Sequence, residues 1–64
     1  MIHVYTSGIY VASINRQAKA ADAYQASAPW LLLMADGKVR RFGTHAEARD
    51  EAQKRFPGCT FKRS

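Results

Sequence analysis

Apolar and polar residues alternate along the start of the chain, on both sides of a Ser7-Gly8 pair. The alternation runs from Ile2 to Thr6 and again from Ile9 to Ser13, and a period of two predicts two β-strands. A Ser-Gly pair between two such runs favours a hairpin, because glycine readily adopts the positive φ of a tight turn. The alternative is one long strand with a glycine bulge.

Residues 15–28 change character, with six alanines and high helix propensity. Asn15 could cap a short helix over residues 16–27, and on a helical wheel Tyr24 shares one side with three of the alanines. Because isolated helices of this length are marginal in water, the segment is either a helix docked by Tyr24 or a loop. Pro29 ends it in both cases.

The run from Trp30 to Ala35 is apolar at every position, as in a strand buried on both faces. Asp36-Gly37 follows, and this dipeptide predicts a two-residue hairpin. The return strand is Lys38 to Phe42, in which neither face is purely apolar. We therefore expect this strand near an edge of the sheet, where charge discourages stray strand pairing.

Thr44 and Glu47 have the spacing of a capping box, which predicts a helix from His45 to about Phe56. The pattern places Ala48, Ala52 and Phe56 on the buried stripe of this helix, with His45 and Arg49 beside the stripe. On its surface it predicts two pairs of opposite charge, Asp50–Lys54 and Glu51–Arg55. Pro57-Gly58 stops the helix, and Cys59 to Lys62 is predicted to form a last short strand.

These elements predict one α+β domain over residues 1–64, with a mostly antiparallel sheet of four or five strands and the main helix on one face. A ferredoxin-like βαββαβ order is the rival, and it requires residues 16–27 to be a true helix. The chain of 64 residues is too short for a thick core. Its single cysteine, Cys59, favours a reducing compartment and hence the cytoplasm.

Neither a signal peptide nor a membrane span is expected. Met1 to Tyr5 lacks the basic and apolar regions of a signal peptide. The longest apolar stretch, Pro29 to Ala35, is about a third of the ~20 residues that cross a bilayer as a helix.

The formal net charge is +5 with a sequence pI near 9.9, and residues 36–64 carry +4 of it, from eight bases and four acids. A basic surface favours polyanions such as nucleic acid, or an acidic protein surface. The alternative is that the charge only keeps the protein soluble, because a net charge of this size is ordinary for a small domain.

Basic residues interleaved with aromatic ones on strands are typical of sheet surfaces that bind nucleic acid through phosphate contact and base stacking. The candidate binding residues on the two predicted strands are Lys38, Arg40, Arg41, Phe42, Lys62 and Arg63. Phe42 or Tyr10 could stack on bases, whereas Trp30 and Phe61 are expected in the core. The helix balances its charges, which argues against a helix in the major groove.

An enzyme would most simply use Cys59 as a nucleophile with His3 or His45 as its base. No local signature accompanies these residues, and a small buried thiol is the commoner role of such a cysteine. No short paired ligand spacing indicates a metal site. We therefore expect no catalytic activity and no cofactor.

The segment Gly37 to Thr44, followed by Glu47-Ala48, resembles the strand-to-helix passage of ethylene-response-factor DNA-binding domains and of integrase arm-binding domains. The resemblance covers Trp30 to Phe56 and implies a sheet laid on DNA. A strand after the helix, and the alanine-rich insert before Pro29, have no counterpart in that motif.

The overall format, a very short basic α/β chain, is similar to phage-encoded inhibitors such as the anti-CRISPR proteins. That likeness implies a partner in the cytoplasm of a bacterial host. The sequence thus predicts a non-enzymatic binding protein that acts on nucleic acid or a nucleoprotein complex through a basic sheet surface. The alternative is a phage-type inhibitor that binds an acidic host protein or complex and blocks it. The oligomeric state is left open.

Overall fold

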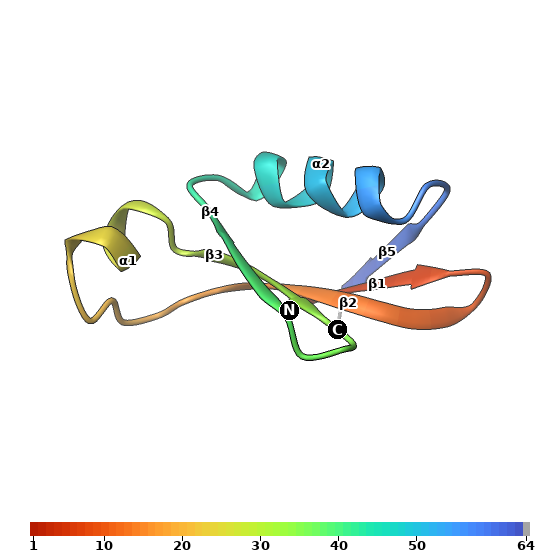
Figure 1. The fold of residues 1–64 in the computed structure, drawn as a ribbon, viewed down its shortest axis with the longest axis horizontal. Coiled ribbons are helices and arrows are strands. Elements are labelled where there is room, and N and C mark those ends of the chain that lie inside the picture. The colour runs from red at the N-terminus through yellow and green to blue at the C-terminus, as the bar shows by residue number, and fades with distance from the viewer. Residues whose placement is uncertain (64) are drawn as a thin grey trace.

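A five-stranded antiparallel sheet organises the chain, and the computed structural model describes it over residues 1–63 (Figure 1). The elements in chain order are β1 (Ile2–Thr6), β2 (Ile9–Arg16), α1 (Ala23–Ser27), β3 (Trp30–Met34), β4 (Val39–Phe42), α2 (His45–Arg55) and β5 (Thr60–Arg63). The strand order is β4-β3-β2-β1-β5, with every neighbouring pair antiparallel. The predicted α+β class is confirmed.

The ferredoxin-like rival is wrong, because β2 and β3 are antiparallel neighbours although α1 lies between them in the chain. A βαβ unit would make its two strands parallel. The long connection instead acts as an enlarged hairpin loop, which extends past one end of the sheet (Figure 1).

The first hairpin forms at Ser7-Gly8 as predicted, and both residues have positive φ (51° and 77°). A turn with two such residues matches the right-handed twist of the strands that it joins. The alternative of one long strand is wrong. A bulge does occur, but at Val11: Val4 pairs with Ala12, and the next residue of β1 pairs with Tyr10.

The alanine-rich connection is mostly not helical. Strand β2 continues to Arg16, so Asn15 pairs with Leu31 and is not a helix cap. The pairing continues one step further, where the Gln17 N–H donates to the Pro29 carbonyl (2.8 Å). Ladder hydrogen bonds to β3 therefore outweigh the helix propensity of the alanines, because an isolated helix this short is marginal in water.

Helix α1 is confined to Ala23–Ser27, and Asp22 caps it by accepting a hydrogen bond from the Gln25 N–H (2.9 Å). A short second helix is thus confirmed, but it is shorter than the predicted range 16–27, and Asp22, not Asn15, is its cap. Tyr24 is 67% exposed and does not dock the helix onto the core.

The loop between β3 and β4 has three residues where the Asp36-Gly37 pair predicted two. The Gly37 N–H donates to the Met34 carbonyl (2.9 Å), and the Met34 N–H donates to the Lys38 carbonyl (2.8 Å). Gly37 has φ 94°, whereas Asp36 has no positive φ. A two-residue turn of type I′ needs two positive φ angles, so the chain forms a type I turn closed by a glycine bulge.

Helix α2 begins and ends where the sequence predicts. The Glu47 N–H donates to Thr44 Oγ1, and the Thr44 hydroxyl donates to a Glu47 carboxylate oxygen (3.2 Å each). The other end is Phe56, whose N–H donates to the Ala52 carbonyl (2.8 Å). Of the predicted surface pairs, Glu51 and Arg55 form an ion pair at 2.7 Å.

The core lies between α2 and the face of the sheet that α2 covers. Its buried members are Val4, Ala12, Ile14, Leu32, Met34, Ala48 and Ala52. The two alanines let the helix approach the sheet closely. Trp30, Phe42 and Phe61 are partly buried at the margin of this core. The His45 ring packs against Trp30 (5.0 Å between centroids), and the Arg49 guanidinium lies 4.5 Å from the Phe61 ring centroid.

Replacing the cap residue, Thr44→Ala, should lower the free energy of unfolding by about 1 kcal/mol, since it removes the oxygen that accepts the Glu47 N–H. Urea unfolding followed by far-UV circular dichroism measures this. Gln53→Ala, at an exposed position of the same helix, serves as the control. Equal stability of the two variants would contradict a stabilising cap.

Candidate functional site

Helix α2 covers one face of the sheet, and no other helix or strand of the described residues covers the opposite one (Figure 1). We call this opposite surface the open face. The strand register places on it His3, Tyr5, Tyr10, Ser13, Asn15, Leu31, Leu33, Val39, Arg41, Thr60 and Lys62. Five of these side chains form a row across all five strands, in the order Lys62, His3, Ser13, Leu33 and Val39.

Three aromatic rings cluster on the open face. His3, Tyr5 and Tyr10 meet edge to face, with ring centroids 5.7–6.4 Å apart. The Lys62 ammonium lies 5.5 Å from the Tyr5 ring centroid. Tyr10 is 44% exposed, so its ring offers a surface to a ligand. This cluster joins flat rings to a cation, which is the combination that holds stacked bases and phosphates.

The other half of the open face is aliphatic. Leu31 and Leu33 are half-buried, and Val39 is 52% exposed. Ser13 lies between the two halves and is only 3% exposed. The apolar run of β3, which predicted a strand buried on both faces, is therefore covered by α2 on one face alone.

The net charge of the protein resides on the strands. They hold five cations and no acid: Arg16, Arg40, Arg41, Lys62 and Arg63. Helix α2 balances three cations against three acids, and the connections between elements balance two against two. The sheet thus has the polarity that attracts polyanions, while α2 contributes no net charge.

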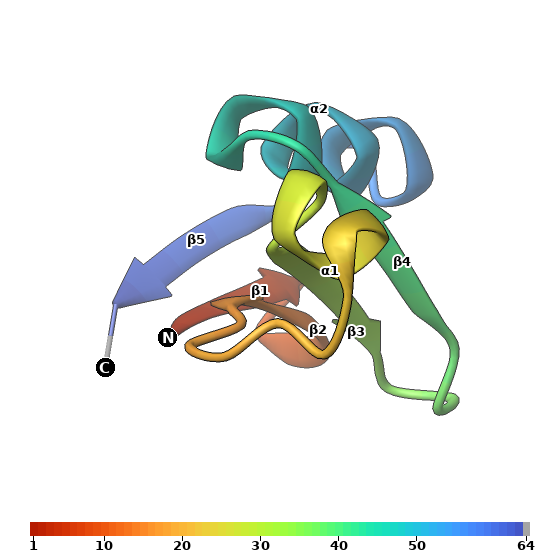
Figure 2. The ribbon, with the colours of Figure 1, turned by 90° about the vertical axis from the view of Figure 1, so that its left-hand side faces the viewer.

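The predicted binding residues do not lie together. Lys38, Arg40, Arg41 and Phe42 lie on or beside β4, whereas Lys62 and Arg63 lie on β5 at the opposite edge of the sheet (Figure 2). Four inter-strand spacings, about 19 Å in total, separate the two edges. The order of the strands depends on where α2 returns the chain, and local patterns in the sequence do not specify it.

Strand alternation divides these residues again. Arg41 and Lys62 point to the open face, whereas Arg40, Phe42 and Arg63 point to the face that α2 covers. Phe42 packs at the margin of the core and is not available for stacking, in contrast to Tyr10. His3 and Tyr5 were missed as candidates, although their alternation with Ile2 and Val4 already placed them opposite the core.

Arg41 also ties the long connection to the sheet. Its Nη1 donates to Gln17 Oε1 (2.7 Å) and to the Ala28 carbonyl (3.4 Å). Both acceptors are neutral, so these bonds orient the guanidinium without cancelling its charge. Arg41 thereby combines a structural role with a fixed positive charge at one side of the open face.

The residues of the enzyme hypothesis are kept apart. Cys59 contacts the Ala52 carbonyl (4.0 Å) near the end of α2, while His45 lies at its start, about 10 Å away along the helix. His3 lies on the open face, on the other side of the sheet. Within residues 1–63, no three His, Cys, Asp or Glu side chains are grouped closely enough to hold a metal ion.

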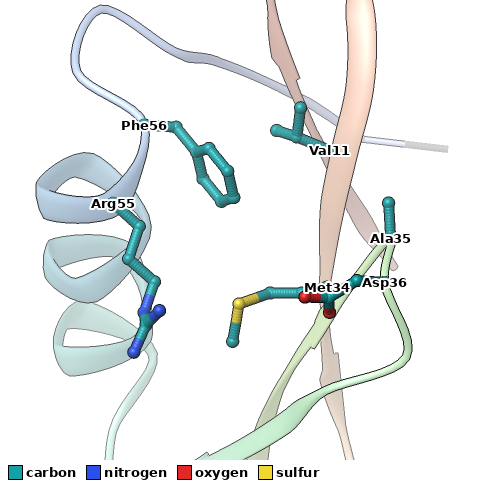
Figure 3. A pocket seen from close by; sticks show the side chains of 6 residues that line it. All are labelled: Val11, Met34, Ala35, Asp36, Arg55 and Phe56. Atoms are coloured by element: carbon teal, nitrogen blue, oxygen red, sulfur yellow. The ribbon is translucent and has the colours of Figure 1, made fainter.

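A groove of about 560 Å³ lies between the end of α2 and strands β2 and β3 (Figure 3). Phe56 projects into it from the end of α2, and Val11 and Met34 line the opposite side (Figure 3). Arg55 and Asp36 line it with opposite charges, and Arg55 is already paired with Glu51. The groove is mainly apolar and does not extend the basic surface.

In residues 1–63, neither helix has the length and apolar character needed to span a bilayer. No family model, no curated protein and no solved structure is significantly similar to this chain.

Proposed function

We propose that this protein is a non-enzymatic nucleic-acid-binding protein that holds a single strand on the open face of its sheet. The observation that carries the proposal is the cluster of His3, Tyr5 and Tyr10 on the uncovered face of the sheet. Two of the five strand cations, Lys62 and Arg41, point to the same face. A polyanion is attracted by the charge, and unpaired bases can stack on the rings.

A single strand fits this surface better than a duplex. Bases of a duplex are stacked on each other and cannot reach Tyr5 or Tyr10, whereas an open strand exposes them. Helices that read the major groove carry a basic outer face, and α2 balances its charges. In this arrangement Lys62 and Arg41 contact phosphates from the two sides of the face.

Titration of labelled single-stranded and duplex DNA at several salt concentrations tests the proposal. The single strand should bind more tightly, with a log-log salt slope of about −1.4 to −2.8, as about −0.7 per phosphate gives for two to four phosphates. Absence of binding at low salt, or tighter binding of the duplex, would overturn the proposal.

The aliphatic half of the open face favours a second function, because phosphates and bases gain little from contact with aliphatic side chains. Leu31, Leu33 and Val39 would suit an inhibitor that docks on an acidic surface of a host nucleoprotein complex and blocks it. The single cysteine favours the cytoplasm as the place of action. The same titration separates the two functions, because the inhibitor needs no affinity for free nucleic acid.

A further inference from the structure

The outer edge of β4 is free of any strand partner within residues 1–63, because β4 ends the sheet. The Met34 N–H donates to the Lys38 carbonyl, so Lys38 directs its backbone groups towards β3. In an antiparallel strand, the backbone N–H and C=O groups of successive residues point alternately towards and away from the neighbouring strand. Val39 and Arg41 therefore direct their N–H and C=O groups outwards. Such an edge is a template for a further strand.

The edge borders a groove of about 500 Å³. Tyr24 of α1 forms one wall of the groove, and the rest of the lining is Lys38 with all of β4. The wall is held in place, because Arg41 donates to Gln17 and to the Ala28 carbonyl at the two ends of the long connection. An incoming segment would thus meet a preformed channel with an exposed aromatic side chain.

The charge of the edge determines its occupant. Lys38, Arg40 and Arg41 form no ion pair with any residue of 1–63. Asp36 and Glu47 are the acids nearest in sequence; Asp36 accepts a hydrogen bond from the Lys38 N–H, and Glu47 accepts one from the Thr44 hydroxyl. A second copy would align its own three cations with these three, and like charges opposed across a strand pair are destabilising. A segment rich in carboxylates is complementary.

We propose that the β4 edge and Tyr24 bind an extended acidic peptide segment of another protein as a sixth strand. Val39 and Arg41 supply the main-chain hydrogen bonds, Lys38 and Arg40 attract the carboxylates, and Tyr24 packs on the added strand. This surface shares Arg41 with the proposed phosphate contacts, but it uses the backbone of Arg41 and lies apart from the aromatic cluster of the open face. The proposal therefore does not depend on nucleic-acid binding.

Fluorescence anisotropy with a labelled peptide of alternating Glu and Val residues tests the proposal. Two N-methylated forms, modified at odd or at even positions, each lack the N–H groups of one side of the peptide strand. Binding should be lost in one form and kept in the other, because a single side of the added strand faces β4. Failure of the unmodified peptide to bind, or an equal effect of both methylation patterns, would overturn the proposal.

Val39→Pro removes an outward N–H without removing a bond to β3, and it should weaken peptide binding about five- to tenfold. Val39→Thr, which keeps the N–H, is the matched control and should bind as the wild type does. The Tyr5→Ala, Tyr10→Ala double variant should also keep its peptide affinity. If a thymidine oligonucleotide displaced the labelled peptide as efficiently as the unlabelled peptide does, the site would bind polyanions in general. That result would contradict strand addition.

Discussion

Leu32→Ala should leave a large fraction of the molecules unfolded at room temperature. Leu32 is 0% exposed, pairs with Ile14 and Arg40 on the neighbouring strands and lies beneath α2. Truncation of a buried leucine costs about 2–5 kcal/mol, because it removes apolar burial and leaves a cavity. A domain of this size has only about 3–5 kcal/mol to lose.

Urea unfolding of the wild type and the variant, followed by far-UV circular dichroism, measures this effect. Val39→Ala is the control, because Val39 is 52% exposed on the open face and its truncation should cost well under 1 kcal/mol. If the two substitutions destabilised the protein equally, the core would not lie between α2 and the sheet.

The double variant Tyr5→Ala, Tyr10→Ala should lose about 10- to 100-fold in affinity for single-stranded DNA. Loss of stacking on an aromatic side chain costs about 1–3 kcal/mol per base, and the two rings lie 6.1 Å apart in one cluster. The fold should persist, because both rings lie on the face that α2 does not cover.

Titration of a labelled oligonucleotide of about 12 nucleotides, within the range that single-strand binders occupy, measures this affinity. Tyr24→Ala is the matched control, since Tyr24 is 67% exposed but lies beside β4, away from the cluster. Unchanged affinity in the double variant would exclude the cluster as the binding surface. Equal losses in both variants would indicate that exposed tyrosines contribute regardless of their position.

Local signals in the sequence were sufficient for the elements that depend on neighbouring residues. The Ser7-Gly8 turn, the Thr44 cap and the end of α2 at Phe56 each follow from interactions within a few residues. The connection before Pro29 could not be predicted in the same way. Its alanines favour a helix, but pairing with β3 extends the sheet to Arg16, and pairing energy depends on tertiary contacts.

The candidate site was predicted in part. Arg41 and Lys62 are on the open face, yet the order of the strands, which separates them, depends on the path of α2 across the sheet. The cluster of His3, Tyr5 and Tyr10 depends on the register of the first hairpin and on its bulge at Val11. A pattern of alternation identifies which residues share a face, but it does not identify which face is left uncovered.

The position of β5 has a consequence for how the sheet is completed during synthesis. Ile2 pairs with Arg63, so β1 acquires its outer neighbour only after β5 has been synthesised. Until then β1 is an exposed edge, and His3 and Tyr5 lie on it. A nascent chain that has already formed β1 to β4 is therefore open to strand addition at both sides, and synthesis of residues 60–63 closes one of them.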